Sequence, residues 1–505
     1  MTLVSSFASV SQASLQDLPD TIVRSTYDRS VLRAGIMHIG VGGFHRAHQA
    51  RYIHNAIEQC SANEWAIVGV GIMPQDEAMN EALKKQDCLY TLVEQSSATP
   101  YQPASCTATI IGSIIEYIWG YQNPEAVFKR MADSAIRLIT LTATEGGYYL
   151  DEGTGELNVN HPAIQHDLQN PLQPHTIFGY LAEGLSQRYQ AGAVPLTLLS
   201  CDNMQENGHI LKKALLAFCR VNRADLANWI ENKFSFPNCM VDRITPAMTA
   251  EARQRFREDY QVDDACPVVC EPFMQWVVED DFCNGRPPLE KVGVLLTHDV
   301  GLYEKMKIRL LNGSHSAMAY LGYLCGYHTI HEIARTPEFE SYLKLLMDNE
   351  VTPLLPEVPG VDLIQYKKSL MERFSNETIK DQTLRICMDG SGKIPKYILP
   401  TIVDQLKVNG SIRLLTLCVA SWLRFLNGID EQGKPIPFAD PQAERLTKIA
   451  QAARENPVPF LELKDIFGEL GQSERFVKEL SDLLTRLYQH GAHDTLVYCC
   501  SSVNK

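Results

Sequence analysis

The chain has 505 residues, of which 45% are hydrophobic and 21% charged, and its formal net charge is −14. This length exceeds what one hydrophobic core usually supports, so we expect a globular protein of two domains. The negative charge argues against nucleic acid or anionic lipid as a partner, and no apolar run approaches the roughly 20 residues of a membrane helix.

The first half of the chain alternates strand-like and helix-like segments. Each short apolar run that indicates a buried strand is followed by a stretch with helical periodicity, the rhythm of a doubly wound, largely parallel sheet. Residues 88–116 show short β-like runs that are interrupted by polar residues, which predicts β strands in addition to those of the parallel sheet. The predicted strands are Gly35–Gly40, Trp65–Ile72, Ile136–Thr142 and Val194–Ser200; the predicted helices are one with the face Ala47, Ala50, Ile53 and Ile57, then Asp76–Lys85, Pro124–Asp133 and Ile177–Gln190.

The second half has a different character. From about residue 300 helical periodicity dominates and β-alternation is not visible. We therefore predict an α/β Rossmann-type, dinucleotide-binding domain over residues 1–297 and a mostly α-helical, substrate-binding and catalytic domain over residues 298–505. The predicted helices are Lys305–Gly326, His328–Ala334, Phe339–Glu350, Leu363–Phe374, Pro400–Leu406, Ile412–Leu426, Gln442–Ala453 and Glu474–His490.

The fourteen cysteines are scattered without a CxxC pair, and most lie in apolar runs. This distribution is typical of buried free thiols in a reducing compartment, so we expect a cytoplasmic protein. Met1–Asp20 lacks the basic and apolar parts of a signal peptide, which agrees with that expectation.

A glycine-rich turn joins the first predicted strand to its helix. Glycines allow a tight turn and let the backbone approach a pyrophosphate closely, and the following helix offers its unpaired N–H groups to the phosphates. The usual third glycine is replaced by His45, so a purely structural turn is the alternative. The predicted cofactor-binding residues here are Gly40, Val41, Gly42, Gly43, Phe44, His45 and Arg46.

Asp76, just past the second predicted strand, is expected to decide the choice of cofactor. Its carboxylate would accept hydrogen bonds from the adenosine ribose hydroxyls and repel a 2′-phosphate, which favours NAD. The alternative is a capping residue for the helix Asp76–Lys85.

Three polar residues stand in an otherwise apolar segment of the second half, KMKIRLLNGSHSAMAYLGYL. Asn312 and His315 are three residues apart and therefore neighbours on a helical face, and Lys307 and His315 are eight apart, about two turns, and again roughly on one side. A lysine in apolar surroundings would have a lowered pKa and suit a general base for an alcohol proton, and an asparagine can donate to a developing alkoxide. From spacing alone, the alternative is an amphipathic helix with a snorkelling lysine and a core histidine.

Six segments together resemble the long-chain mannitol dehydrogenases, a family of zinc-independent secondary-alcohol dehydrogenases that act on polyols. They follow in the right order with compatible spacing, and the resemblance runs from about Gly35 to Phe476. The glycine loop departs from the usual fingerprint in the same way as the family does. The segments are GVGGFHRAHQ, QDCLYTLVE, LTATEGGYY, SCDNMQENG, FPNCMVDRITP and KIRLLNGSHS.

The resemblance implies a role for each matched residue. Lys307 is implied to be the general base, and Asn203 and Asn312 the hydrogen-bonding pair for the substrate oxygen. Glu145 is implied to assist proton passage between the base and solvent. The residues implied to bind the polyol are His315, Asp242, Arg385 and Lys393.

The implied reaction is the NAD-dependent interconversion of a polyol and a ketose, by default D-mannitol and D-fructose, without a metal. Because the chain is large and self-contained and shows no coiled coil or apolar repeat, we expect a monomer. Relatives that act on D-arabinitol, fructuronate or mannitol 1-phosphate leave the substrate open. A metal-dependent dehydrogenase is an alternative, since His45-x-x-His48 and His490-x-x-His493 have ligand spacing but no accompanying Cys or carboxylate set. A nucleotide-binding regulator without catalysis is the alternative from another class.

Overall fold

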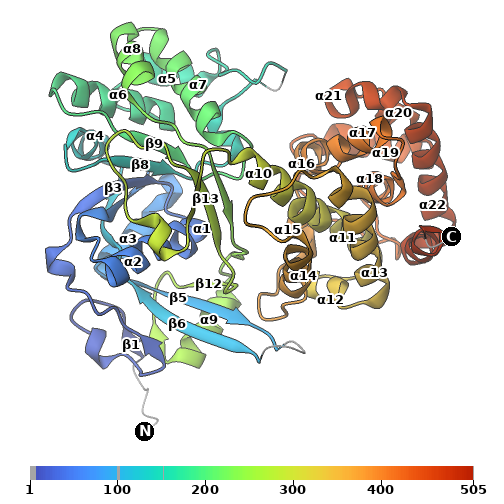
Figure 1. Cartoon of the computed structure of the whole chain (residues 1–505), viewed down its shortest axis with the longest axis horizontal. Coiled ribbons are helices and arrows are strands. Elements are labelled where there is room, and N and C mark those ends of the chain that lie inside the picture. The colour runs from blue at the N-terminus through green and yellow to red at the C-terminus, as the bar shows by residue number, and fades with distance from the viewer. Residues whose placement is uncertain (1–6, 99–102, 152, 504–505) are drawn as a thin grey trace. The chain divides into compact units, whose positions relative to one another are not determined.

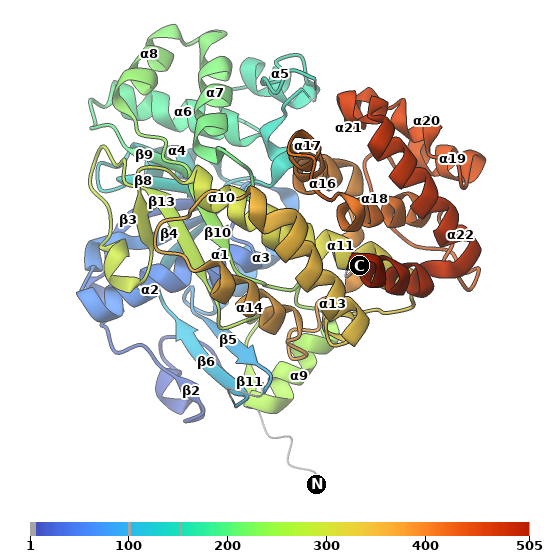
Figure 2. The same ribbon diagram turned by 45° about the vertical axis from the view of Figure 1, so that its right-hand side comes forward.

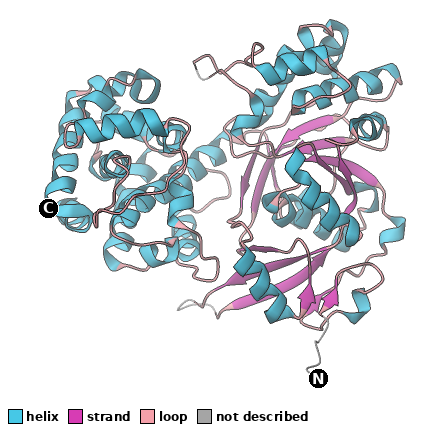
Figure 3. Cartoon of the chain, turned by 180° about the vertical axis from the view of Figure 1, so that it is seen from behind, coloured by secondary structure: helices cyan, strands magenta, loops and turns pink. Residues whose placement is uncertain are grey.

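The computed structural model describes residues 7–98, 103–151 and 153–503. The chain divides into unit 1, Met1–Gly301, and unit 2, Leu302–Lys505, where the sequence predicted a change of character at residues 297/298. All strands of the described residues belong to unit 1, whereas unit 2 is helical (Figure 3). The predicted fold class, a Rossmann-type domain followed by a helical one, is confirmed.

Unit 1 is built on a five-stranded sheet with the order β7-β4-β3-β8-β9, in which all neighbours are parallel. The chain moves outward from β3 to β4 and β7, then returns to β8 and β9 on the other side of β3. Figure 1 labels β3, β8 and β9 of this sheet. This order places the topological switch point at β3. The strands are β3 (Ala34–Ile39), β4 (Ala66–Gly71), β7 (Ile114–Trp119), β8 (Leu138–Leu141) and β9 (Thr197–Ser200).

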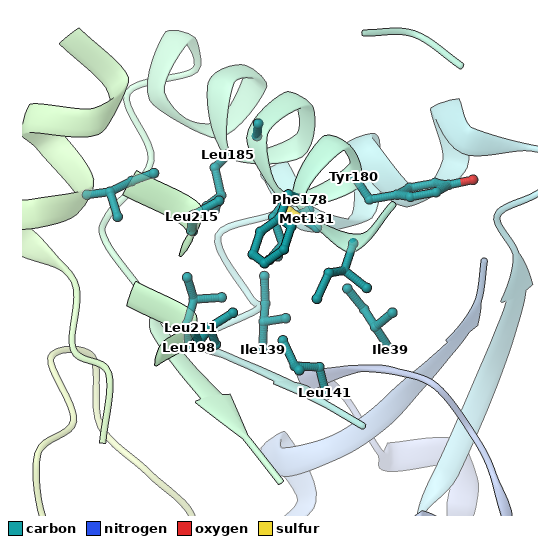
Figure 4. Close-up of a cluster of buried hydrophobic side chains, with 14 of the residues drawn as sticks. Ile39, Met131, Ile139, Leu141, Phe178, Tyr180, Leu185, Leu198, Leu211 and Leu215 are labelled. Atoms are coloured by element: carbon teal, nitrogen blue, oxygen red, sulfur yellow. The ribbon is translucent and has the colours of Figure 1, made fainter. Parts of the chain in front are cut away.

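Helices cover both faces of this sheet, because successive strand residues point to opposite sides and both sides are apolar. On one face, strand residues such as Ile139 and Leu198 pack under Phe178 and Leu211 of the covering helices (Figure 4). Residues one position away in each strand, among them Leu138 and Leu199, belong to a second core that includes α2. The helices of unit 1 are α1 (Gly43–Ala47), α2 (Gln49–Cys60), α3 (Glu77–Lys85), α4 (Pro124–Ala132), α5 (Pro162–Gln169), α6 (Ile177–Gln190), α7 (Asn207–Arg220), α8 (Ala224–Lys233) and α9 (Ala250–Tyr260).

Three smaller sheets complete unit 1. The predicted β region at residues 88–116 supplies two strands of a four-stranded sheet with the order β12-β5-β6-β2. A three-stranded sheet, β10-β13-β14, and the pair β1-β11 were not predicted, because their strands are too short to show alternation. The bounds are β1 (Ala8–Ser9), β2 (Ile22–Val23), β5 (Tyr90–Ser96), β6 (Ser105–Ile111), β10 (Cys239–Asp242), β11 (Val262–Asp263), β12 (Val268–Cys270), β13 (Gln275–Glu279) and β14 (Leu295–Thr297).

Unit 2 is organised around one long helix, in which α10, a π-helical turn and α11 follow without a break (Figure 2). Helices α15, α16 and α18 pack against α11, and α22 packs against α18 and is kinked at Gly491 (φ 82°). The bounds are α10 (Gly301–Lys307), the π turn (Ile308–Asn312), α11 (Gly313–Leu324), α12 (Ile330–Ala334), α13 (Pro337–Leu345), α14 (Leu363–Phe374), α15 (Thr383–Cys387), α16 (Gly390–Tyr397), α17 (Leu399–Lys407), α18 (Arg413–Phe425), α19 (Ala443–Ala453), α20 (Val458–Leu461), α21 (Lys464–Phe467) and α22 (Glu474–Val503).

The cysteines are all free thiols, and nine of the fourteen are buried. Within the described residues, no helix combines the length and the apolar character that crossing a bilayer requires.

Four histidines in the described part of unit 1 are buried, each at most 4% exposed, and the pKa is lowered in three of them, His38, His45 and His54. Burial lowers the pKa of His38 and of His54 to about 3 and places the pKa of His45 well below its usual value. Nδ1 of His54 lies 2.8 Å from the Tyr27 hydroxyl and also accepts from the Gly112 N–H. The folded protein therefore keeps three neutral imidazoles that the unfolded chain would protonate near pH 6.

The free energy of unfolding should fall as the pH drops from 7.5 to 5.5. The folded pKa of each of these histidines lies below the unfolded value of about 6.5, so the unfolded chain takes up more protons in this window. Each histidine contributes a loss of about 1.4 kcal/mol, hence about 4 kcal/mol for the three. Urea unfolding at both pH values, with His54→Gln beside the wild type, checks this: the variant should lose about 1.4 kcal/mol less. An equal loss in both proteins would contradict it.

Candidate active site

The carboxyl edge of the five-stranded sheet gathers most of the predicted site residues of unit 1. Ile39 stands in register with Val70 on one side and with Leu141 on the other, and Leu141 with Ser200. The loops that leave these strands therefore emerge side by side, where ligands of doubly wound sheets bind. The site residues on these loops are Gly40–Arg46, Asp76, Glu145 and Asn203.

Of the three glycines in the loop, Gly40 is tightly packed, whereas Gly42 and Gly43 have room above them. Gly40 has φ +97°, and a Cβ there would lie 2.2 Å from the carbonyl oxygen of Thr142, so only glycine fits. A Cβ on Gly42 would meet no atom within 4 Å, so the space above this residue is open. Gly42 is also the residue from which α1 begins. The loop thus offers an accessible backbone for the close approach of a phosphate.

The side chains of His45 and Arg46 are turned into the interior of unit 1. The His45 ring stacks on that of His38, with centroids 3.5 Å apart and planes at 9°. This ring stack fills the space that the third glycine of the usual fingerprint leaves between helix and strand. The Arg46 guanidinium donates to the Cys266 carbonyl and lies over the Tyr90 ring. A cofactor contact from either residue would come from its backbone.

The other two residues of the loop also pack inward. Val41 is 7% exposed and sits over Gly69, where a Cβ would come within 2.8 Å of it. The Phe44 ring stacks on that of His48 at 4.9 Å. The loop is therefore fixed from below by apolar and aromatic contacts, while the space above Gly42 stays open.

Asp76 lies at the end of β4, as its predicted role requires. A Cβ on Gly71, the last residue of β4, would come within 2.6 Å of the Asp76 Cβ. The carboxylate accepts from the Met73 N–H at 2.9 Å, and its side chain makes no capping bond to α3. Together with burial, this carboxylate raises the pKa of Tyr117 on the neighbouring strand. This bond caps the 3-10 helix Pro74–Asp76, which leads directly into α3, so the carboxylate has a capping role at this place.

Glu145 and Asn203 are exposed residues on adjoining loops, and the buried Asp202 links these loops. Its carboxylate accepts from the backbone N–H groups of Ala143 and Thr144, at 3.1 and 2.8 Å. Sequence reasoning missed Asp202; the available signal was an acidic residue directly before Asn203.

Asp242 is the last residue of β10 and is buried. It stands opposite Gln275, whose carbonyl oxygen lies 2.8 Å from Nε2 of His48. The amide of Asn207 ties β10 to the β9 loop, since it donates to the carbonyls of Asp202 and Cys239, at 3.0 and 2.8 Å. The structure thus connects the strand of Asp242 to the loop of Asn203, although the two belong to different sheets.

Lys307, Asn312 and His315 lie on the long helix of unit 2, and each is less than 10% exposed. The sequence predicted a regular helix here, but residues 308–312 form a π turn, in which the Gly313 N–H donates to the Ile308 carbonyl. Five residues of an α-helix would set Lys307 and Asn312 about 140° apart around the axis. The i→i+5 bonding of a π turn instead places them one turn apart on the same face. His315 follows Asn312 by three residues of α-helix and is its neighbour.

Arg385 and Lys393 lie on α15 and α16, which pack against α11. Arg385 forms a two-bond ion pair with Asp381, with both distances 2.7 Å. The Lys393 ammonium donates to the carbonyl of Ile386, next to Arg385, at 3.2 Å. Unit 2 therefore brings its predicted residues to neighbouring helices, with the charge of Arg385 already compensated.

One group of three residues among the described part of the chain has ligand atoms close enough for a metal: His166, Asp167 and His175. Neither histidine pair proposed from its spacing belongs to it. The Asp167 carboxylate already accepts from two backbone N–H groups and the Thr176 hydroxyl. The two imidazoles stack in parallel, 3.8 Å apart at 8°, so their lone pairs do not converge on one point.

Comparison with known proteins identifies the chain's relatives. Residues 34–291 match the model of the mannitol dehydrogenase Rossmann domain, and residues 299–488 that of the mannitol dehydrogenase C-terminal domain. Mannitol dehydrogenase 2 of Saccharomyces cerevisiae is 45% identical over 486 residues, 96% of each chain. Mannitol 2-dehydrogenase of Aspergillus terreus is 45% identical over 484 residues, 94% of this chain and 95% of that one.

Two solved structures agree with these relatives. Pseudomonas fluorescens mannitol 2-dehydrogenase, in a ternary complex with NAD and D-mannitol, matches with a TM-score of 0.90 and 41% identity over 97% of this chain and 99% of that one. A D-sorbitol dehydrogenase in substrate-free form matches with a TM-score of 0.86 and 36% identity, over 96% and 100%. The resemblance seen in the sequence is confirmed: the chain belongs to the mannitol dehydrogenase family.

Proposed function

We propose that this protein interconverts D-mannitol and D-fructose with NAD as the cofactor. The observation that carries the proposal is the 41% identity, over nearly the whole chain, to an enzyme whose structure holds NAD and D-mannitol. The pairing of Arg385 with Asp381 supports a neutral polyol, because a sugar acid or a phosphorylated polyol would need an uncompensated cation in its site.

The cofactor would be held by the carboxyl edge of unit 1. The open backbone at Gly42 suits the pyrophosphate, and the Asp76 carboxylate at the end of β4 suits the adenosine ribose hydroxyls. NAD supplies the hydride acceptor of the reaction. Asp76 would also repel the 2′-phosphate of NADP, which favours NAD.

The proton chemistry is assigned to residues of both units. Lys307 accepts the proton of the substrate hydroxyl, and Asn203 and Asn312 donate hydrogen bonds to that oxygen as negative charge develops on it. The π turn supports this assignment, because it puts Lys307 and Asn312 on the same face. Glu145 passes the proton to solvent. The other polyol hydroxyls are read by His315, Asp242, Arg385 and Lys393.

We also propose that the enzyme acts in the cytoplasm as a monomer and has no nucleic-acid partner. Its free cysteines suit a reducing compartment, and its net charge of −14 disfavours polyanions. Analytical ultracentrifugation at micromolar concentration tests the oligomeric state, and the sedimenting mass should be that of one chain.

The purified protein should reduce NAD⁺ with D-mannitol at a kcat/KM at least about tenfold above those for D-sorbitol, D-arabinitol, D-mannonate and mannitol 1-phosphate, a difference of about 1.4 kcal/mol in transition-state binding. NADH absorbance measures each rate. A preference for the sugar acid or the phosphate would contradict the neutral-polyol proposal.

Replacing Lys307 with alanine should lower kcat for mannitol oxidation by about 10³-fold, because the general base is removed. The Kd for NADH, followed by its fluorescence, should stay within about threefold of the wild type, since the lysine acts on the alcohol. Lys305→Ala is the matched control, a half-buried lysine on the same helix. Similar kcat values for the two variants would exclude Lys307 as the base.

Replacing Asp76 with asparagine should shift the cofactor preference towards NADPH. Asparagine keeps an acceptor for the Met73 N–H but removes the charge that repels a 2′-phosphate. The ratio of kcat/KM for NADH to that for NADPH should fall by about 10- to 100-fold, the usual strength of a charged hydrogen bond. Glu77→Gln, the same charge change one residue further along, should leave this ratio unaltered. If both variants changed the ratio equally, Asp76 would act only through its charge and not through contact with the ribose.

A further inference from the structure

The loops after β8 and β9 carry two residues of the proposed function, Glu145 and Asn203, and start from paired strand ends. Leu141 and Ser200 stand in register, so both loops begin at the same edge. A base-to-solvent proton route through Glu145 requires that this side chain keep a fixed place relative to Asn203. The geometry of the two loops must therefore be enforced by contacts between them.

The β8 loop passes through a backbone conformation that its sequence does not favour. Thr144 has φ 60° and ψ 165°, a region that is occupied almost only by glycine. A β-branched residue there needs surroundings that hold it in place. Glu145 follows directly and begins a short 3-10 helix, so its position depends on the backbone of Thr144.

Asp202 supplies that hold from the neighbouring loop. Its Oδ1 accepts from the Thr144 N–H at 2.8 Å, and its Oδ2 accepts from the Ala143 N–H at 3.1 Å. Oδ2 also accepts from the Tyr148 hydroxyl at 2.8 Å and lies 3.3 Å from the Ser200 hydroxyl. The carboxylate thus bonds the two backbone N–H groups that lead into the strained residue and the side chain of the residue that ends the 3-10 helix.

Only a carboxylate satisfies this set of partners. The contacts of Asp202 are donors, and an ionised carboxylate has acceptors alone, whereas an asparagine amide would turn one N–H group towards another. Asp202 is 6% exposed, and burial raises its pKa because the ionised carboxylate has lost most of its contact with water. A buried carboxylate is retained there because the loop donors compensate it.

We propose that Asp202 is a positioning residue of the reaction, which fixes Glu145 beside Asn203 by bracing the Ala143–Thr144 backbone. The inference rests on the proposed function of Glu145. Asp202 itself need not touch substrate or cofactor: it acts through the loop, and its removal should affect turnover more than cofactor binding.

The test compares Asp202→Asn with Asp167→Asn. Asp167 is another buried aspartate of unit 1. It also accepts from two consecutive backbone N–H groups and a hydroxyl, at His175 and Thr176, but none of these partners is a site residue. Asp202→Asn should lower kcat for mannitol oxidation by roughly 100-fold, the effect of a displacement of about 1 Å, with the Kd for NADH within about threefold of the wild type. Asp167→Asn should keep wild-type kcat. Equal kcat values for the two variants would overturn the proposal.

Two further measurements separate positioning from a merely structural role. Hydrogen exchange at the Ala143 and Thr144 amides should speed up by at least about tenfold in Asp202→Asn and not in Asp167→Asn. In a Glu145→Gln background, Asp202→Asn should cost less than about threefold in kcat, because the two changes act on one function. Full additivity, or unaltered exchange, would overturn the proposal.

If Asp202→Asn does not fold, the same three measurements are made on Tyr148→Phe, which removes one hydrogen-bond donor to the Asp202 carboxylate. This variant should lower kcat by about tenfold. The hydrogen-exchange arm needs no turnover. An inactive wild-type protein would therefore contradict the proposed function, while the exchange rates would still decide whether Asp202 braces the loop.

Discussion

The parallel pairing of β3 with β4 on one side and β8 on the other is the constraint on which the rest of unit 1 depends. It aligns the carboxyl ends of neighbouring strands, so that loops far apart in the sequence meet backbone to backbone. The close approach of Gly40 to the Thr142 carbonyl follows from this alignment, whereas that of Gly71 to Asp76 arises within the loop after β4. At such distances a side chain has no room, which is why glycine ends β4 and follows β3. The same closeness lets Asp202 reach the backbone of the β8 loop.

Where periodicity was strong, the sequence was sufficient to predict the structure. The strands of the five-stranded sheet are apolar on both faces and alternate with amphipathic helices, and α6 and α14 have the bounds that the pattern predicted. The π turn could not be predicted, because the helix that follows it is apolar on nearly all sides, and one residue more or less leaves no trace in such a pattern. Yet this turn is what brings Lys307 and Asn312 to one face, so the reason for their spacing became visible only in the structure.

The residues of the candidate site likewise fall into those that the sequence could predict and those that only the structure reveals. Residues whose chemistry is unusual for their surroundings, such as Lys307 in an apolar helix, could be singled out from the sequence. Asp202 could not, because its partners are backbone N–H groups 58 and 59 residues away, and backbone donors have no sequence signature. Arg385 and Asp381 are four residues apart, so an ion pair between them could have been predicted from the sequence. Only the structure shows that the guanidinium makes two bonds to the carboxylate.

The stacked histidines explain how the glycine loop works without its third glycine. In the usual fingerprint that glycine lets the helix approach the strand closely. Here His45 occupies the position, and its ring lies flat on that of His38, which is itself hydrogen-bonded to Thr140 at 2.7 Å. The two stacked rings are buried between α1 and β3, so glycine at position 45 would leave a cavity there, at a cost of about 2–4 kcal/mol. The departure from the fingerprint is therefore a different solution to the same packing constraint, and it leaves the open backbone at Gly42 unaffected.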